Sequence, residues 1–239
     1  MDRFLENKTA IITGGTRGIG YSIAEALLDA GASVAVCGRS QHSTDEAVKT
    51  LRMWSKSKVV GAAADVSKPD QVSTFFQMVD REFGAPDILV NNAGVGKFAS
   101  VAALTIEDWT RTLETNLSGV FYCCHEALPR FQQRGGGYVI NISSLAGRNA
   151  FAGGAAYNAS KFGLNGFSEA MMLDHRNDNV RVSYIMPGSV ATEFGSGAGS
   201  TAEWKIAPQD IADIVIMLLK MPSRTLISRV EVRPSRPPK

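Results

Sequence analysis

The sequence predicts an α/β fold in which helices cover both faces of one doubly wound parallel sheet of about seven strands. Short apolar runs typical of strands alternate with helical stretches almost from one end of the 239 residues to the other. Strands that are separated by helices pair in parallel. The apolar runs do not alternate strictly with polar residues, as expected of strands buried on both faces. No linker, repeat or shift in composition divides the chain, so we expect a single domain over residues 1–239.

The first half of the chain contains four predicted strands, each followed by glycine or a polar side chain. The first apolar run stops at Gly14 and Gly15, and the apolar residues after Gly20 then recur at helical spacing until Gly31. The predicted strands are 9–12, 33–37, 59–64 and 87–90, and the further predicted helices are 45–54 and 69–83.

The second half continues the alternation after a long helical stretch over 106–131, which glycines at 135–137 bring to an end. The segment 193–207 is rich in glycine and serine and follows the carboxyl end of a strand, where such sheets bind ligands. This position favours a mobile lid over a plain surface loop. The remaining predicted elements are strands at 138–142, 180–186 and 225–232 and helices at 155–175 and 208–220.

The composition argues against several classes of function. Formal net charge is +2, and Lys and Arg are spread along the chain, so the basic face of a nucleic-acid-binding protein is not expected. The basic, proline-containing cluster at 229–239 is interpreted as a solvated end. Cys37, Cys123 and Cys124 are odd in number, and two are adjacent, which disfavours a disulfide framework. No Cys/His cluster has metal-ligand spacing, so no metal site is expected.

The N-terminal residues do not have the pattern of a targeting segment. Residues 1–8 are charged and lack the apolar core of a signal peptide. No apolar run reaches the ~20 residues that span a bilayer. We therefore expect a cytoplasmic protein with no membrane partner.

A glycine-rich loop lies between the first predicted strand and the first predicted helix. It reads Thr13-Gly14-Gly15-Thr16-Arg17-Gly18-Ile19-Gly20, a G-x3-G-x-G spacing that differs from the usual G-x-G-x-x-G. Glycines let the backbone approach a pyrophosphate closely, and a helix N-terminus offers free N–H groups and a partial positive charge. The loop therefore indicates a dinucleotide site.

A second group of residues has the parts of a proton-transfer device. Tyr157 and Lys161 are four residues apart, which on a helix places them one turn apart on the same face. The hydroxyls of Ser143 and Ser144 lie upstream, at the predicted end of a strand. A free phenol has a pKa near ~10, and an ammonium group beside it lowers that pKa by favouring the phenolate.

Six motifs, in this order, resemble those of the short-chain dehydrogenase/reductase family. They are the glycine loop, Asn91-Asn92-Ala93-Gly94, Asn116 in Glu114-Thr115-Asn116-Leu117, Ser144, Tyr157-x3-Lys161 and Pro187-Gly188. The resemblance covers roughly residues 5–222. It implies a single-domain Rossmann-type oxidoreductase that moves a hydride between a nicotinamide cofactor and a carbonyl or alcohol. It also implies a homodimer or homotetramer, with a dinucleotide-binding half at 5–95, a catalytic half at 96–232 and a basic, proline-rich tail at 233–239.

The end of the second predicted strand indicates which cofactor is bound. It reads Val36-Cys37-Gly38-Arg39-Ser40, without the carboxylate that would bind a ribose 2′-hydroxyl and repel a phosphate. Arg39 and Arg17 can instead meet a 2′-phosphate, so the sequence predicts NADP(H). The resemblance adds the other cofactor-binding residues: Gly14, Thr16, Gly18, Ile19, Gly20, Ser40, Asp65, Val66, Asn92, Ala93, Gly94, Tyr157, Lys161, Pro187, Gly188, Val190 and Thr192.

The same resemblance implies a catalytic tetrad of Asn116, Ser144, Tyr157 and Lys161. Tyr157 would protonate the carbonyl oxygen, while Lys161 would lower the pKa of the phenol and hydrogen-bond the nicotinamide ribose. Ser144 would donate a hydrogen bond to the substrate oxygen. It is chosen over Ser143 because the thirteen-residue step to Tyr157 matches the family. Asn116 would anchor a water that passes protons from Lys161 to solvent.

The substrate is less closely defined. The motifs are most similar to those of bacterial 3-oxoacyl carrier-protein reductases, although the tail at 229–239 departs from the ending of those enzymes. We therefore expect an NADPH-dependent reductase of ketones or aldehydes with an open cleft. One alternative is a dehydrogenase that oxidises an alcohol, a sugar or a hydroxy acid. Another is a sensor or scaffold protein that binds NADP(H) without turnover, which the complete tetrad disfavours.

Overall fold

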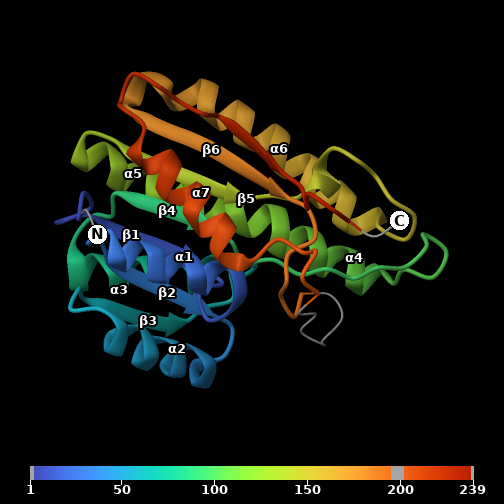
Figure 1. The fold of residues 1–239 in the computed structure, drawn as a ribbon, viewed down its shortest axis with the longest axis horizontal. Helices are drawn as coiled ribbons and strands as arrows, with labels where there is room; N and C mark the ends of the chain where they lie inside the picture. Colours follow the sequence, from blue (N-terminus) through green and yellow to red (C-terminus); the bar gives the residue numbers. More distant parts are fainter. Residues whose placement is uncertain (1–2, 195–201, 238–239) are drawn as a thin grey trace.

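The computed structural model describes residues 3–194 and 202–237 and confirms the predicted fold. Within these residues seven strands form one sheet, entirely parallel, in the order β3-β2-β1-β4-β5-β6-β7 (Figure 1). The order reverses between β1 and β4, and such a switch point is where doubly wound sheets bind ligands. The strands are β1 (Thr9–Thr13), β2 (Ser33–Gly38), β3 (Val59–Ala63), β4 (Ile88–Asn91), β5 (Gly137–Ile142), β6 (Val180–Pro187) and β7 (Arg229–Val232).

Helices cover both faces of this sheet. They are α1 (Gly18–Asp29), α2 (Gln41–Trp54), α3 (Pro69–Phe83), α4 (Ile106–Leu113), α5 (Gly119–Arg134), α6 (Ala155–His175) and α7 (Pro208–Lys220). Figure 1 shows α1 and α7 side by side on one face, and residues of α3, α5 and α6 form the core of the other. Adjacent residues of β1 divide between the two cores, Ile12 facing α1 and α7 and Ile11 facing α3 and α5. This two-sided burial explains the missing alternation in the apolar runs.

The long helix predicted over 106–131 is interrupted in the structure. A π turn at Glu114–Ser118 joins α4 to α5. One extra residue in a turn leaves little trace in hydrophobic spacing, so the sequence could not indicate it, and such turns are frequent at functional sites. Helix α5 continues to Arg134 and ends where Gly135 takes a left-handed conformation, with φ +77°.

Two other boundaries differ from prediction for local reasons. Helix α2 begins before residue 45, because the Ser40 hydroxyl accepts a hydrogen bond from the Ser43 N–H and caps the helix at Gln41. Strand β7 contains only the last four residues of the predicted 225–232, since the Thr225 N–H closes a turn onto the Pro222 carbonyl.

Within the lid predicted at 193–207, residues 195–201 lie outside the described residues, and the lid stays a prediction. Across the described ranges, no helix has the length and apolar character needed to cross a bilayer. In the same ranges, no three or more His, Cys, Asp or Glu side chains gather as a metal site would require. All three cysteines are buried and unbridged.

Candidate active site

A cleft of about 1070 Å³ opens at the carboxyl ends of the central strands. Gly20, Ser40 and Asn116 do not line it, but each supports a segment that does. The predicted site residues that line it are Gly14, Thr16, Arg17, Gly18, Ile19, Arg39, Asp65, Val66, Asn92, Ala93, Gly94, Ser144, Tyr157, Lys161, Pro187, Gly188, Val190 and Thr192.

The glycine loop brings bare backbone to the edge of the cleft. Gly14 and Gly18 have φ values of +63° and +55°, which other residues adopt only with strain. A Cβ on Gly20 would lie 2.3 Å from the Gly14 carbonyl oxygen, so only glycine lets α1 pack beneath the loop. Within the described residues, no side chain caps the start of α1 and no acidic residue stands in its first turn. Its N–H groups and positive dipole end therefore fit a pyrophosphate.

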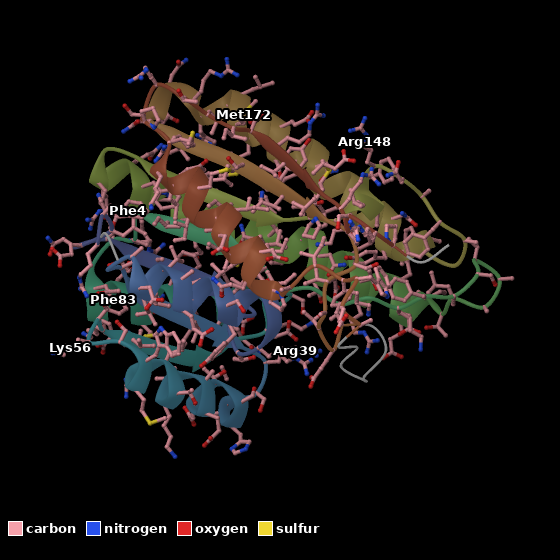
Figure 2. All side chains as sticks on the ribbon, viewed as in Figure 1. Phe4, Arg39, Lys56, Phe83, Arg148 and Met172 are labelled. Atoms are coloured by element: carbon pink, nitrogen blue, oxygen red, sulfur yellow. The ribbon has the colours of Figure 1, made fainter. Side chains whose placement is uncertain are left out.

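The two arginines predicted at the cofactor phosphate are not equivalent. Arg39 lines the cleft at the carboxyl end of the strands, whereas Lys56 and Phe83 lie toward the opposite end of the molecule (Figure 2). Arg17 forms an ion pair with Glu193, with 2.8 Å between Nη1 and Oε2. Both partners of this pair are exposed, so it stabilises little. Arg39 makes no such pair with the described residues and is therefore the better placed to meet a phosphate.

Helix α6 carries Tyr157 and Lys161 into the cleft, one turn apart. Lys161 is only 5% exposed, and its Nζ donates a hydrogen bond to the Ile142 carbonyl, 2.9 Å away. Burial lowers the pKa of Lys161 from 10.5 to about 8. Burial also raises the pKa of Tyr157, and a hydrogen bond with Ser144 acts in the opposite direction.

The sequence led us to expect a lowered pKa for Tyr157, but in this structure the pKa is raised. The Lys161 Nζ is engaged by a backbone carbonyl and lies 5.8 Å from the centroid of the Tyr157 ring. Desolvation of the phenol outweighs the favourable contacts, so its pKa moves up. The Ser144 hydroxyl is a hydrogen-bond partner that acts against this rise by favouring the phenolate.

The two neighbouring serines have different tasks. The Ser143 hydroxyl is buried and donates to Asn165 Oδ1. The Ser144 hydroxyl accepts from the Ala146 N–H at 3.1 Å and hydrogen-bonds Tyr157. This supports the choice of Ser144 over Ser143 as the residue that meets the substrate.

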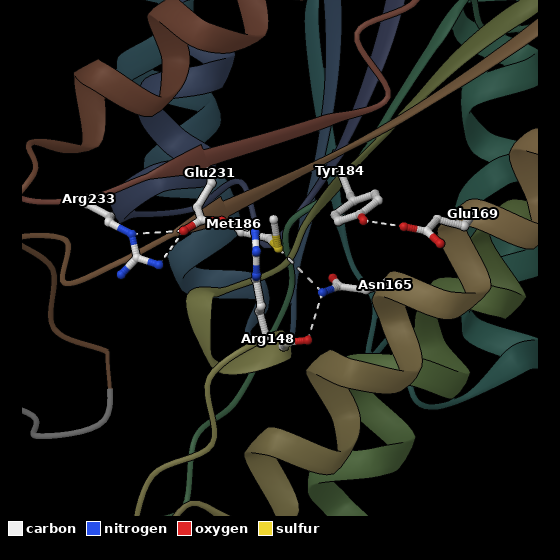
Figure 3. A network of polar contacts seen from close by, with 8 residues as sticks. Arg148, Asn165, Glu169, Tyr184, Met186, Glu231 and Arg233 are labelled. Carbon is white, nitrogen blue, oxygen red and sulfur yellow. Dashed lines mark hydrogen bonds and ion pairs between the residues drawn. The ribbon is translucent and has the colours of Figure 1, made fainter.

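Two asparagines of α6, which sequence reasoning missed, fix the loop after Ser144. Asn158 Nδ2 donates to the Ala146 carbonyl at 2.7 Å. Asn165 Nδ2 donates to the Gly147 carbonyl at 3.0 Å and contacts the Met186 sulfur (Figure 3). Asn165 stands one turn after Lys161, and this spacing was the one signal available in the sequence.

Asn116 is fully buried in the π turn, and its amide is already in use. Its Oδ1 accepts from the Val95 N–H at 2.8 Å, and its Nδ2 donates to the Val95 carbonyl at 2.9 Å and to Ser160 Oγ at 3.1 Å. The Oδ1 atom has a second acceptor lone pair, so the predicted role of anchoring a water stays a prediction. The amide also positions Val95, which lines the cleft.

The described part of the C-terminal tail is mostly exposed, as its composition suggested, but it is not a free end. Strand β7 adds to the edge of the sheet beside β6, and the Gly188 N–H donates to the Val232 carbonyl at 2.8 Å. The residues that follow, Arg233, Pro234 and Pro237, line the cleft. The tail thus forms part of the cleft wall.

One acidic residue within the basic tail anchors this wall. Glu231 Oε2 lies 2.8 Å from Arg148 Nη1, and Glu231 Oε1 accepts from Arg233 Nε at 2.8 Å (Figure 3). Its contacts with Arg233 and Arg148 hold the pKa of Glu231 below its usual value. In the sequence this carboxylate is hidden among cations, and its partner Arg148 lies far away along the chain.

A glycine loop that opens onto a cleft at the switch point of a parallel sheet is the arrangement of a dinucleotide-binding protein. The family model described as short chain dehydrogenase matches residues 8–203. The chain belongs to the short-chain dehydrogenase family of oxidoreductases, which confirms the resemblance found in its motifs.

Known proteins similar to this chain carry different names. The 3-oxoacyl-[acyl-carrier-protein] reductase FabG of Chlamydia trachomatis is 37% identical over 194 residues, covering 81% of this chain and 78% of that protein. The 3alpha-hydroxysteroid dehydrogenase of Mediterraneibacter gnavus is 34% identical over 195 residues, with the same two coverages. The crystal structure of a metagenomic short-chain oxidoreductase in complex with NADP has a TM-score of 0.85 and 35% identity, covering 98% of this chain and 99% of that chain. The names of the two relatives indicate different substrates.

Proposed function

We propose that this protein reduces a ketone or aldehyde to an alcohol, with NADPH as hydride donor and Tyr157 as proton donor. The observation that carries the proposal is the position of the Tyr157 phenol. It lines the cleft, hydrogen-bonds Ser144 and stands one turn from the buried Lys161. Reduction of a carbonyl needs a hydride on carbon, which bound NADPH supplies. It also needs a proton on oxygen, which a group in the cleft must deliver.

The three side chains divide the work on the carbonyl oxygen. Tyr157 gives its hydroxyl proton to that oxygen, and its raised pKa suits this role because the phenol stays protonated at neutral pH. Ser144 donates a hydrogen bond that stabilises the developing negative charge. Lys161, with a pKa of about 8, is mostly charged at neutral pH and favours the phenolate that the transfer leaves behind.

We assign the rest of the cleft to successive parts of the cofactor. The glycine loop and the start of α1 take the pyrophosphate, and Arg39 takes the 2′-phosphate. Asp65 and Val66 border the adenine. Asn92, Ala93 and Gly94 lie on the ribose side, and the segment from Pro187 to Thr192 borders the nicotinamide. The NADP held by the metagenomic oxidoreductase supports this assignment.

We expect a strong preference for NADPH over NADH that depends on Arg39. A hydrogen bond to a charged group contributes about 1.5–3 kcal/mol, so Arg39→Ala should lower kcat/KM for NADPH by roughly 10- to 100-fold. The value for NADH should change little, because NADH has no 2′-phosphate. Steady-state kinetics with both cofactors measure this, and Arg52→Ala on α2 is a matched control away from the cleft. A wild-type enzyme that prefers NADH would refute the assignment of NADP(H).

A screen for NADPH consumption tests the function itself. Acetoacetyl thioesters, diketones and aromatic aldehydes cover the main classes of carbonyl substrate, and we expect turnover with at least one of them. NADPH binding without NADPH consumption in the presence of any of these compounds would instead support the sensor or scaffold alternative.

The name of the hydroxysteroid dehydrogenase relative favours testing the oxidative direction as well, with NADP⁺ and alcohols. Faster oxidation than reduction at neutral pH would reverse the proposed direction.

The proposal includes a homo-oligomer built on α4, α5 and α6. Large apolar side chains are exposed along these helices, where Phe121 packs near Phe167 with 6.3 Å between ring centroids. An apolar face of this kind is typical of a protein–protein interface. Light scattering in solution gives the assembled mass, and a monomer would contradict the proposal. The exposed side chains are Ile106, Trp109, Phe121, Phe162 and Leu173.

A further inference from the structure

Three phenylalanines form a run of ring contacts that includes Tyr157, and we call them the aromatic collar: Phe98, Phe151 and Phe194. The Phe98 ring lies 5.6 Å from the Tyr157 ring at 81°, an edge-to-face contact. Phe194 lies 5.7 Å from Tyr157, and Phe151 lies 5.6 Å from Phe98. All three line the cleft, and each is 44–46% exposed. Phe98 and Phe151 could not be singled out from the sequence, because neither belongs to a motif.

Backbone hydrogen bonds hold together the two loops that carry Phe98 and Phe151. The Ala99 N–H donates to the Gly153 carbonyl at 2.8 Å, which ties the Phe98 loop to the Phe151 loop. The Phe151 N–H in turn donates to Asn158 Oδ1 at 3.4 Å. Asn158 follows Tyr157 on α6, so the collar and the proton donor share one support. Rings fixed in this way form a surface ready for a ligand.

Apolar residues of the tail and of the segment before α7 line the same cleft. Pro234 and Pro237 of the tail line the cleft together with Trp204. Arg233 is paired with Glu231, and Lys205 Nζ stands 5.8 Å from the centroid of the Trp204 ring. The cleft near Tyr157 therefore offers flat, neutral surfaces more than a site for an anionic group.

We propose that the substrate carbonyl is attached to, or part of, a flat aromatic or fused cyclic ring that the aromatic collar holds. This inference rests on the proposed function and narrows its substrate class. A flat ring can make edge-to-face contacts with Phe98 and Phe194, which contribute beyond the burial of area. A linear acyl chain makes no such contacts and loses rotational freedom when it is bound.

Competing substrates and single substitutions test the inference. In NADPH-dependent reduction, kcat/KM for 2-tetralone should exceed that for S-acetoacetyl-N-acetylcysteamine by at least about tenfold, which is ~1.4 kcal/mol. Phe98→Leu keeps an apolar side chain and removes the ring. It should raise KM for 2-tetralone about tenfold and that for the thioester less than threefold, while Phe98→Tyr should restore the wild-type ratio. Phe83→Leu, at the far end of the molecule, is the control (Figure 2).

The possible outcomes separate this inference from the proposed function. Preference for the thioester, or an equal loss of both activities in Phe98→Leu, overturns the aromatic substrate class and leaves the reductase intact. No NADPH consumption with any carbonyl compound overturns both. Phe151→Leu removes a collar ring from the other loop, so it provides the same comparison if the first variant folds poorly.

Discussion

The Tyr157→Phe variant is expected to lose turnover by about 10³-fold or more while binding NADPH nearly as tightly as the wild type. A positioned general acid contributes about 10²- to 10⁴-fold, and this substitution removes only the oxygen that carries the proton. The ring remains, so its contacts with Phe98 and Phe194 persist and the collar keeps its shape. The measurements are kcat for carbonyl reduction and the dissociation constant of NADPH from titration of its fluorescence.

Tyr21→Phe provides the matched control for this variant. Tyr21 lies on α1 and packs against the core away from the cleft, and the same single atom is removed. We expect activity close to that of the wild type. If Tyr157→Phe kept more than about a tenth of the wild-type rate, the proton would have to come from another group, and the assignment of Tyr157 as general acid would fail.

The parts of the site that follow from local chain geometry could be predicted from the sequence. Helical periodicity places Tyr157 and Lys161 on one face of α6, and the structure has that helix at the predicted residues. The glycine spacing requires a backbone of positive φ, which Gly14 and Gly18 adopt. The parallel sheet follows from alternation along the chain. In each case a residue and its near neighbours carry the information.

The parts that depend on contacts between distant segments could not be predicted. The pairing of Arg148 with Glu231 spans 83 residues, and no spacing rule connects the Phe98 loop with the Phe151 loop. The tail was assigned to solvent because its composition is basic and proline-rich, while a single carboxylate and a strand edge decide its position. The directions of the pKa shifts could not be predicted either, because they depend on the burial and the contacts of each side chain in the folded structure.

Lys161 shows how such a local environment links stability to function. Among the described residues, no carboxylate forms an ion pair with the Lys161 Nζ. Desolvation alone lowers the pKa of Lys161 from 10.5 to about 8. At ~1.36 kcal/mol per pKa unit, its charge costs the folded state about 3 kcal/mol at neutral pH. A buried charge without an ion-pair partner lowers the stability of the fold, and the proposed reaction would explain why such a charge is present.

Lys161→Met should therefore change activity and stability in opposite directions. We expect kcat to fall by about 10²-fold or more, because the charge that favours the Tyr157 phenolate is lost, and NADPH affinity to fall as well. At pH 7 the variant should be up to about 2 kcal/mol more stable in urea unfolding, because the buried charge is removed. The gain is smaller than the full cost of the charge, because the Ile142 carbonyl loses its hydrogen-bond donor. Lys56→Met, at an exposed position, is the control.

The pH dependence of this stability difference gives the sharper test. Below about pH 8, Lys161 is charged in both the folded and the unfolded state, and the full cost is present. Between about 8 and 10.5 the folded protein releases this proton while the unfolded chain keeps it, so the wild type gains stability relative to the variant as pH rises. The gain should approach about 3 kcal/mol, and other titrating groups cancel in the comparison. If the unfolding free energies of the wild type and the variant changed in parallel from pH 7 to 10, Lys161 would keep an ordinary pKa in the folded protein. Its buried charge would then need a partner that this geometry does not provide.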